Sequence, residues 1–297
     1  MDVALPLVPA PRVQTGGLLW GAVGVLLFSM SLPATRVAVG EFDPVFVGAS
    51  RAAAAGLLAL GVLAWRRPPM PSRAEWGRLV QVAAGVVLGW PLLTSVAMGQ
   101  AGAIHGAILT GLLPAATAVA GVLLARDRPS VRLWLAAAAG LLCVLVFAVV
   151  QGAGRPGPAD ALLLLAVAIC AVGYAAGGVL ARTMGGPLVI SLALAMCLPI
   201  TLPLALLHWD GTGIQAAGWG AWSGFLYVSL VSQYLGFFAW YRGLALGGVA
   251  RVGQLQLAQP VLSMVWAALL LHEAVTWQAA MAAVAVLACV VLTQRAR

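Results

Sequence analysis

The chain has 297 residues, of which 63% are hydrophobic and only 8% are charged, and its mean hydropathy is +1.03. Soluble domains carry about 25% charged residues, so this composition excludes an ordinary soluble fold and indicates a protein embedded in lipid. All 16 basic residues are arginine. Because lysine is absent, a lysine-dependent phosphate loop and Schiff-base chemistry on lysine are both excluded.

The N-terminal segment 1–16 is rich in proline and lacks a basic stretch followed by an apolar core. We therefore expect a cytoplasmic tail rather than a cleaved signal peptide. A membrane-spanning helix needs about 20 apolar residues. Apolar runs of this length predict ten spanning helices, at 17–39, 44–65, 76–98, 103–125, 132–150, 160–181, 187–207, 219–244, 249–271 and 275–293.

The longest Gly/Pro-rich break in the middle of the chain, residues 151–159, is expected to join two halves. The first half, 17–150, and the second, 160–297, each contain five predicted helices. If the N-terminus lies inside, thirteen arginines fall on the inner side and only Arg36 and Arg155 on the outer side. By the positive-inside rule we expect both termini in the cytoplasm of a bacterial inner (plasma) membrane protein.

Two stretches of similar pattern, 102–127 and 248–273, indicate a duplication. Aligning Pro114 with Pro260 gives an offset of 260 − 114 = 146, at which Thr110 meets Gln256. Because five is an odd number, the second half would enter the membrane from the opposite side. Inverted repeats of this kind surround a midplane site in many secondary transporters. The alternative is a duplicated structural bundle without transport activity.

Three tyrosines on the helix 219–244, Tyr227, Tyr234 and Tyr241, are seven residues apart, which predicts one shared face near Phe238. Their rings and hydroxyls would suit aromatic or bulky apolar side chains of a substrate. The alternative is an aromatic belt at the membrane interface, which we favour for Tyr241 because it lies beside Arg242.

Polar residues also recur along the helices that face this one. Gln256, Gln259 and Ser263 follow an i, i+3, i+7 pattern, so they are predicted to share a face. Their groups could bind the carboxylate and ammonium of a zwitterion, or they could only hydrogen-bond neighbouring helices. The same two alternatives, substrate cavity and helix packing, apply to Trp90, Thr94 and Thr110.

Pro114 and Pro260 each remove a backbone hydrogen bond and are expected to kink their helices, either as a hinge or as a static bend. His105 is a candidate proton-coupling group because histidine titrates near neutral pH. The predicted helices carry no Asp or Glu at mid-membrane depth, where ion-coupled carriers commonly place one. A neutral or zwitterionic substrate therefore fits better than a drug cation exchanged for protons.

Arg51 lies seven residues into the helix 44–65, where a charge must pair or reach the surface. We favour an outer charge cluster with Arg36, Glu41 and Asp43 over a direct role in binding a substrate carboxylate. A coupling role is a further hypothesis for Arg51.

Several short motifs, in this order, resemble the EamA-type ten-helix exporters of the drug/metabolite transporter superfamily. They are Trp20 with the Pro33–Arg36 stretch, Pro44 to Arg51, the P-x12-[DE] pairs Pro114/Asp127 and Pro260/Glu273, and the Glu273–Thr276 ending. The resemblance covers nearly the whole chain. It implies a central cavity lined by helices three, four, eight and nine, and it extends to exporters of aromatic and other neutral amino acids.

The sequence thus predicts an all-α integral membrane protein with ten transmembrane helices in two inverted five-helix repeats around a central cavity. We expect a monomeric exporter of small neutral or zwitterionic metabolites, with the lipid bilayer and a small-molecule substrate as partners and without a nucleic-acid partner. No cofactor, metal site or catalytic residue is expected. Alternatives are transport of sugars, phosphorylated compounds or drugs, and a membrane-embedded enzyme, which would need paired carboxylates or metal ligands near an interface.

Overall fold

The computed structural model describes residues 15–127 and 157–275 without a gap, and single positions between 130 and 142 and between 277 and 285. All regular structure in these residues is helical. Seven helices are long and apolar enough to cross a membrane: Gly16–Ala38, Pro44–Arg66, Arg73–Gln100, Ala103–Ala125, Pro158–Met184, Gly186–Leu207 and Val249–Leu271. The prediction of an all-α membrane fold is confirmed for the described part of the chain.

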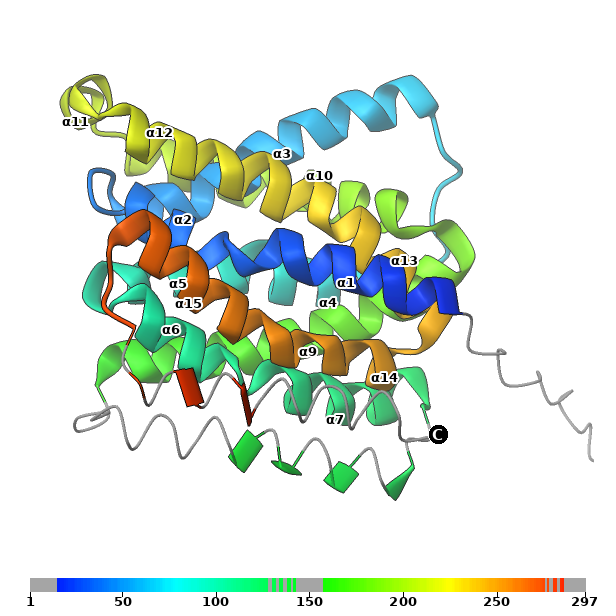
Figure 1. The fold of residues 1–297 in the computed structure, drawn as a ribbon. Helices are drawn as coiled ribbons and strands as arrows, with labels where there is room; N and C mark the ends of the chain where they lie inside the picture. Colours follow the sequence, from blue (N-terminus) through cyan, green and yellow to red (C-terminus); the bar gives the residue numbers. More distant parts are fainter. Residues whose placement is uncertain are drawn as a thin grey trace, which may run out of the picture.

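Several membrane-spanning stretches in Figure 1 consist of more than one consecutive helical element, and each such stretch is called a rod below. In chain order the elements are α1 Thr15–Ser29, α2 Ser31–Ala38, α3 Pro44–Arg66, α4 Arg73–Val82, the π-helix η1 Ala83–Gly89, α5 Trp90–Gln100, α6 Ala103–Thr110, α7 Leu113–Ala125, α9 Pro158–Met184, α10 Gly186–Leu207, α11 Gly211–Ala216, α12 Trp219–Leu226, the π-helix η2 Tyr227–Leu235, α13 Gly236–Gly247, α14 Val249–Gly253, the 3₁₀ helix η3 Gln254–Leu257 and α15 Ala258–Leu271.

The observed helices follow the predicted apolar runs closely wherever the structure describes them. The stretch from α12 to α13 is helical as predicted, although its serine, glutamine and tyrosine side chains make it less apolar than the seven spans. A short helix, α11, occupies part of the segment after residue 207 that was expected to be a loop. The predicted helices 132–150 and 275–293 lie largely outside the described residues.

Three of the rods are interrupted about one turn before a proline. α1 ends four residues before Pro33, α6 ends four residues before Pro114, and the 3₁₀ helix η3 lies just before Pro260. Proline has no N–H to donate, and its ring crowds the carbonyl of the residue four positions earlier. The prolines favour these interruptions but do not force them alone, because α10 contains Pro199 and Pro203 and stays continuous.

Small residues allow α1 and α13 to pack closely. Gly17 and Gly21 on α1 face Gly243 and Gly247 on α13; a Cβ added to Gly17 would lie 2.6 Å from the backbone nitrogen of Gly247. Glycines four residues apart on each helix let two backbones approach, which is a common way to join helices in lipid. Elsewhere α3 packs on α10, and the α6–α7 rod packs antiparallel to the α14–α15 rod.

The π-helices η1 and η2 end at Gly89 and Leu235, which are 235 − 89 = 146 positions apart. Left-handed residues follow α7 and α15 at Arg126 and His272, again 272 − 126 = 146 positions apart. Irregular backbone thus recurs at the same spacing as the prolines that the two halves share. This agreement extends the internal similarity from sequence to backbone conformation.

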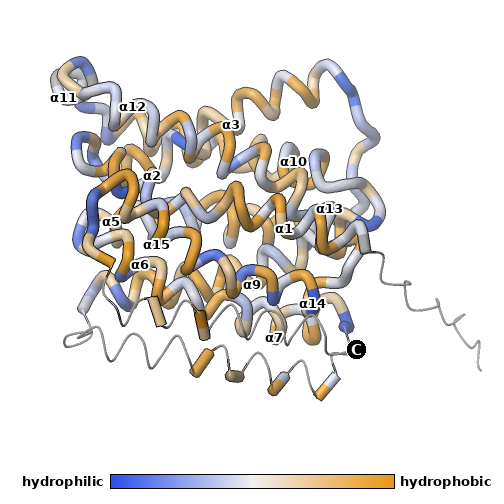
Figure 2. Tube along the Cα trace, in the orientation of Figure 1, coloured by the Kyte–Doolittle hydropathy of each residue, from blue (hydrophilic) through white to orange (hydrophobic). Residues whose placement is uncertain are grey.

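The helices meet at two ends that differ in charge, and hydrophilic residues mark both ends in Figure 2. At one end Glu41 accepts a hydrogen bond from the backbone of Gly218, and Asp43 pairs with His208. At the other end Asp127 pairs with Arg182 at 3.5 Å. The described arginines of this second end are Arg66, Arg67, Arg73, Arg78, Arg126, Arg182, Arg242 and Arg251.

Candidate functional site

Polar side chains meet where the α6–α7 and α14–α15 rods are interrupted. Gln254 donates a hydrogen bond from Nε2 to the carbonyl of Pro114 at 3.2 Å. Thr117 donates from its hydroxyl to Oε1 of Gln256 at 3.5 Å. Gln254 and Gln256 are buried, as is Gln259 on the following turn. The two proline-containing segments thus face each other through amide and hydroxyl groups inside the protein.

These contacts leave part of each glutamine side chain without a protein partner. The buried atoms that lack a hydrogen bond include Oε1 of Gln254, Nε2 of Gln256 and Oε1 of Gln259. A buried polar group without a partner costs about 1–3 kcal/mol. Donor and acceptor capacity is therefore available here for a polar ligand.

The two π-helices also meet through a glutamine. Gln233 on η2 donates from Nε2 to the carbonyl of Val86 on η1 at 3.2 Å, and its Oε1 has no partner. Gln233 was not among the predicted site residues, although a glutamine in the middle of an apolar helix often marks a functional position. π-Helical turns are frequent at functional sites. The Gln233 contact joins η2 to η1, whereas the contacts of Gln254 and Gln256 join η3 to α7.

The three tyrosines do not share one face, so this prediction was wrong. Tyr227 donates to the carbonyl of Leu27 on α1 at 2.8 Å, whereas Tyr241 donates to the carbonyl of Gly173 on α9 at 3.3 Å. The cause is η2, because the wider turns of a π-helix break the two-turn repeat that holds in an α-helix. Tyr241 was expected at the membrane interface, but it is fully buried.

Tyr234 occupies the position between these two tyrosines and is also buried. Its hydroxyl lies 2.8 Å from Oγ of Ser191 on α10. Its ring centroid lies 4.9 Å from that of Phe238, in an edge-to-face arrangement. Trp90, which opens α5, packs in the same hydrophobic core as Tyr234 and Phe238. The predicted aromatic residues of helices three and eight are thus brought into one core.

The predicted threonine and serine sites are occupied by local or interhelical hydrogen bonds. Thr94 donates to the carbonyl of Trp90 at 2.6 Å, and Thr110 donates to that of Ala107 at 3.1 Å. Ser263 donates to the carbonyl of Ser29 on α1 instead of joining the glutamines. Pro33 explains this contact, because its missing N–H leaves the Ser29 carbonyl free.

Arg51 is not part of an outer charge cluster, so the interpretation that we favoured was wrong. Its side chain is 1% exposed, and α3 directs it between α2 and η2. Arg36 instead donates to the carbonyl of Met98 at 2.7 Å. The nearest polar partners of Arg51 are the hydroxyls of Thr35 at 3.5 Å and Ser232 at 3.2 Å.

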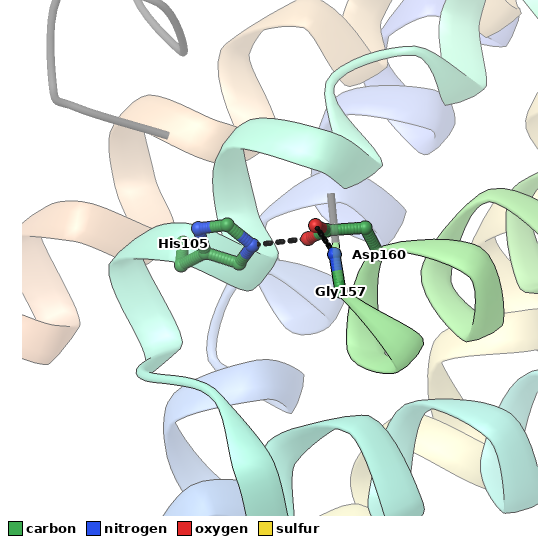
Figure 3. Close-up of polar contacts among 3 residues, drawn as sticks. All are labelled: His105, Gly157 and Asp160. Atoms are coloured by element: carbon green, nitrogen blue, oxygen red, sulfur yellow. Dashed lines mark hydrogen bonds and ion pairs between the residues drawn. The ribbon is translucent and has the colours of Figure 1, made fainter. Parts of the chain in front are cut away.

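His105 lies at the start of α6, where its Nε2 is 2.5 Å from Oδ1 of Asp160 on α9 (Figure 3). The other carboxylate oxygen of Asp160 accepts a hydrogen bond from the backbone of Gly157 at 2.7 Å. His105 is 36% exposed. The pair therefore links the two halves at one end of the molecule rather than inside it.

Comparison with known proteins identifies the class of this membrane protein. A model of the EamA-like transporter family matches residues 15–149 and again residues 157–295. The chain belongs to the EamA-like transporter family. The same family model therefore matches both halves of this EamA-like protein. The resemblance seen in the sequence is confirmed at the level of the family.

Two individual proteins extend this EamA-like assignment. The "Uncharacterized transporter YdeK" of Bacillus subtilis (strain 168) is 45% identical over 285 residues, which cover 95% of the chain and 98% of the relative. A solved structure described only as "Crystal structure of protein" has a TM-score of 0.67 at 20% identity, over 94% of this chain and 96% of that one. The first similarity supports membrane transport, whereas the second supports the fold alone.

Proposed function

We propose that the chain exports small neutral or zwitterionic metabolites, chiefly aromatic and other bulky neutral amino acids. Transport would proceed by alternating access of two inverted five-helix repeats, residues 17–150 and 160–297, joined by the linker 151–159. The chain would act as a monomer in the bacterial inner membrane. The arginine-rich end would face the cytoplasm together with both termini.

The internal similarity supports the inverted arrangement. The family model matches each half once, and prolines, π-helices and left-handed residues recur at one spacing. The α6–α7 and α14–α15 rods, which correspond between the halves, pack antiparallel to each other. Two equivalent rods that cross the same bilayer in opposite directions are what an inverted repeat requires.

The observation that carries the substrate proposal is the set of buried glutamines with unpaired atoms. These atoms are the amide oxygens of Gln254 and Gln259 and the amide nitrogen of Gln256. Oxygens can accept hydrogen bonds from an ammonium group, and the nitrogen can donate to a carboxylate. A neutral zwitterion would satisfy both kinds of group without adding net charge. Tyr234, Phe238 and Trp90 add aromatic surface in the neighbouring core.

The proposal is tested by measuring the flux of labelled phenylalanine and tryptophan in proteoliposomes, with and without an imposed proton gradient. Saturable flux that is indifferent to the gradient is expected for a facilitator. Flux that follows the gradient would direct attention to the His105–Asp160 pair as a coupling site. The absence of saturable flux for every amino acid in a broad panel would refute the proposed substrate class.

A further inference from the structure

Arg51 carries a buried positive charge without a negative partner. It is the one charged side chain that is fully buried among the residues that the structure describes. None of the ion pairs found in this part of the chain includes it. Burying an unpaired charge in a membrane protein costs several kcal/mol, so such residues are rare and usually functional.

The neighbouring side chains do not satisfy the guanidinium group. A guanidinium has five N–H donors, whereas the structure gives it two hydrogen bonds, at 3.5 Å to Thr35 and 3.2 Å to Ser232. Its Nε has no hydrogen-bond partner. Ser232 also lies 2.5 Å from the hydroxyl of Ser31, so one serine serves two neighbours. The neighbouring side chains therefore engage the guanidinium donors only weakly.

In the described part of the chain, the hydrogen bonds of Arg51 go to side-chain hydroxyls and not to backbone carbonyls. The carbonyls of Leu26, Leu27 and Ser29 at the end of α1 accept hydrogen bonds from Ser29, Tyr227 and Ser263.

We infer that Arg51, rather than the amide nitrogen of Gln256, is the main binding group for the carboxylate of the transported molecule, between Thr35 of α2 and Ser232 of η2. A carboxylate can accept two parallel hydrogen bonds from one guanidinium, and it would replace the long contacts with the Thr35 and Ser232 hydroxyls. A single arginine balances a monoanionic group. The inference rests on the proposed function in one respect, because the carboxylate belongs to the substrate class proposed there.

Matched acids and amides test this inference with the full-length chain purified in detergent. The ligand pairs are phenylalanine with phenylalaninamide and phenylacetate with phenylacetamide, and the readout is the ligand-dependent shift in Tm. We expect the two acids, and not their amides, to raise the Tm. Arg51→Gln should weaken the apparent affinity for the acids by about 10- to 100-fold, as expected for a lost charge-assisted hydrogen bond.

Arg66→Gln is the matched control because Arg66 is an exposed arginine on the same helix. It should keep the response to both acids. If Arg51→Gln aggregates, Arg51→Lys replaces it; lysine keeps the charge but loses the two-pronged geometry, so an intermediate loss of affinity is expected.

Four results would overturn the inference: equal shifts with acids and amides, an unchanged acid response in the Arg51 variant, no response to any carboxylate, or the full shift with chloride or sulfate alone. The flux assay distinguishes failure of the Arg51 inference from failure of the proposed function. Phenylalaninamide flux equal to that of phenylalanine would leave the proposed function standing and refute the role of Arg51. Acid-selective binding that depends on Arg51, without flux of any amino acid, would refute the proposed function and leave the role of Arg51 in binding carboxylates standing.

Discussion

Asp127 and Glu273 cap corresponding helices in opposite halves of the chain. Asp127, which follows α7, caps the start of α14, and Glu273, which follows α15, caps the start of α6. The Oδ2 atom of Asp127 accepts a hydrogen bond from the backbone of Ala250 in α14 at 2.8 Å. The carboxylate of Glu273 accepts hydrogen bonds from Ala103 and Ile104 in α6, each at 3.2 Å. The two acids are 273 − 127 = 146 positions apart. Each half therefore places a negative group at the positive end of a helix in the other half.

Replacing Glu273 should weaken the contact between the halves. Glu273→Gln keeps the shape but loses the charge at the α6 N-terminus, so the free energy of unfolding should fall by about 1 kcal/mol, within the range for helix caps. Thermal denaturation in detergent measures this effect. Glu75→Gln is the control, because Glu75 caps α4 within one half by bonding Ser72. Equal Tm values for Glu273→Gln and the wild type would contradict the prediction.

The close contact between α1 and α13 should tolerate no added methyl group. Gly17→Ala would place a Cβ 2.6 Å from the Gly247 nitrogen, so the helices must separate. We expect a loss of about 1–3 kcal/mol, as for other overpacked sites. Gly61→Ala on α3 is the control, since nothing lies within 4 Å of its added Cβ. That variant should be as stable as the wild type or slightly more stable; a similar loss in both variants would argue against the packing explanation.

Tyr234 and Tyr227 should separate substrate binding from stability. Tyr234→Leu removes the aromatic ring that packs against Phe238, and the KM for phenylalanine should rise about tenfold, as for the loss of a stacking partner with its buried area. Tyr227→Phe removes only the hydroxyl that bonds the Leu27 carbonyl, so it should lower stability by about 1 kcal/mol and leave KM unchanged. Flux kinetics and thermal denaturation of both variants check this. The same change in KM for both would place the substrate elsewhere.

The glutamines should divide in a similar way. Gln254→Leu leaves the Pro114 carbonyl without its donor, and stability should fall by about 1 kcal/mol, as for interhelical hydrogen bonds in lipid. Gln256→Leu removes an amide whose oxygen accepts only a long hydrogen bond from Thr117, at 3.5 Å, so transport should suffer more than stability. The comparison requires both the Tm and the flux of each variant. A Gln256→Leu protein with normal flux would show that this amide serves packing alone.

The helix extents could be predicted because lipid imposes a length on each apolar run and because Gly, Pro and charged residues mark the breaks. α3, for example, begins at Pro44, where the predicted run began, with Asp43 accepting a hydrogen bond from Phe46. The π-helix η2 could not be predicted, because nothing in its composition distinguishes it from an α-helix. The prediction that Tyr227, Tyr234 and Tyr241 share one face was wrong for this reason.

The environment of Arg51 was also beyond the reach of the sequence. Its polar neighbours lie 16 and 181 positions away, and only the tertiary fold brings Thr35 of α2 and Ser232 of η2 to Arg51. The sequence showed the depth of Arg51 in its helix. It could not show whether the side chain turns toward the surface or toward the protein interior.

The proline-dependent interruptions also affect how the protein is made. Carbonyls of Leu27, Ser29, Val86 and Pro114 in the first half accept hydrogen bonds from side chains in the second half: Tyr227, Ser263, Gln233 and Gln254. While the chain emerges from the ribosome, these carbonyls lack the side-chain donors of the second half, and the Ser29 carbonyl is the clearest case because Pro33, four residues later, has no N–H to donate. An unsatisfied polar group in the bilayer core costs several kcal/mol. The first half must therefore wait in an unfinished state, held by water or by the insertion machinery, until the later helices arrive.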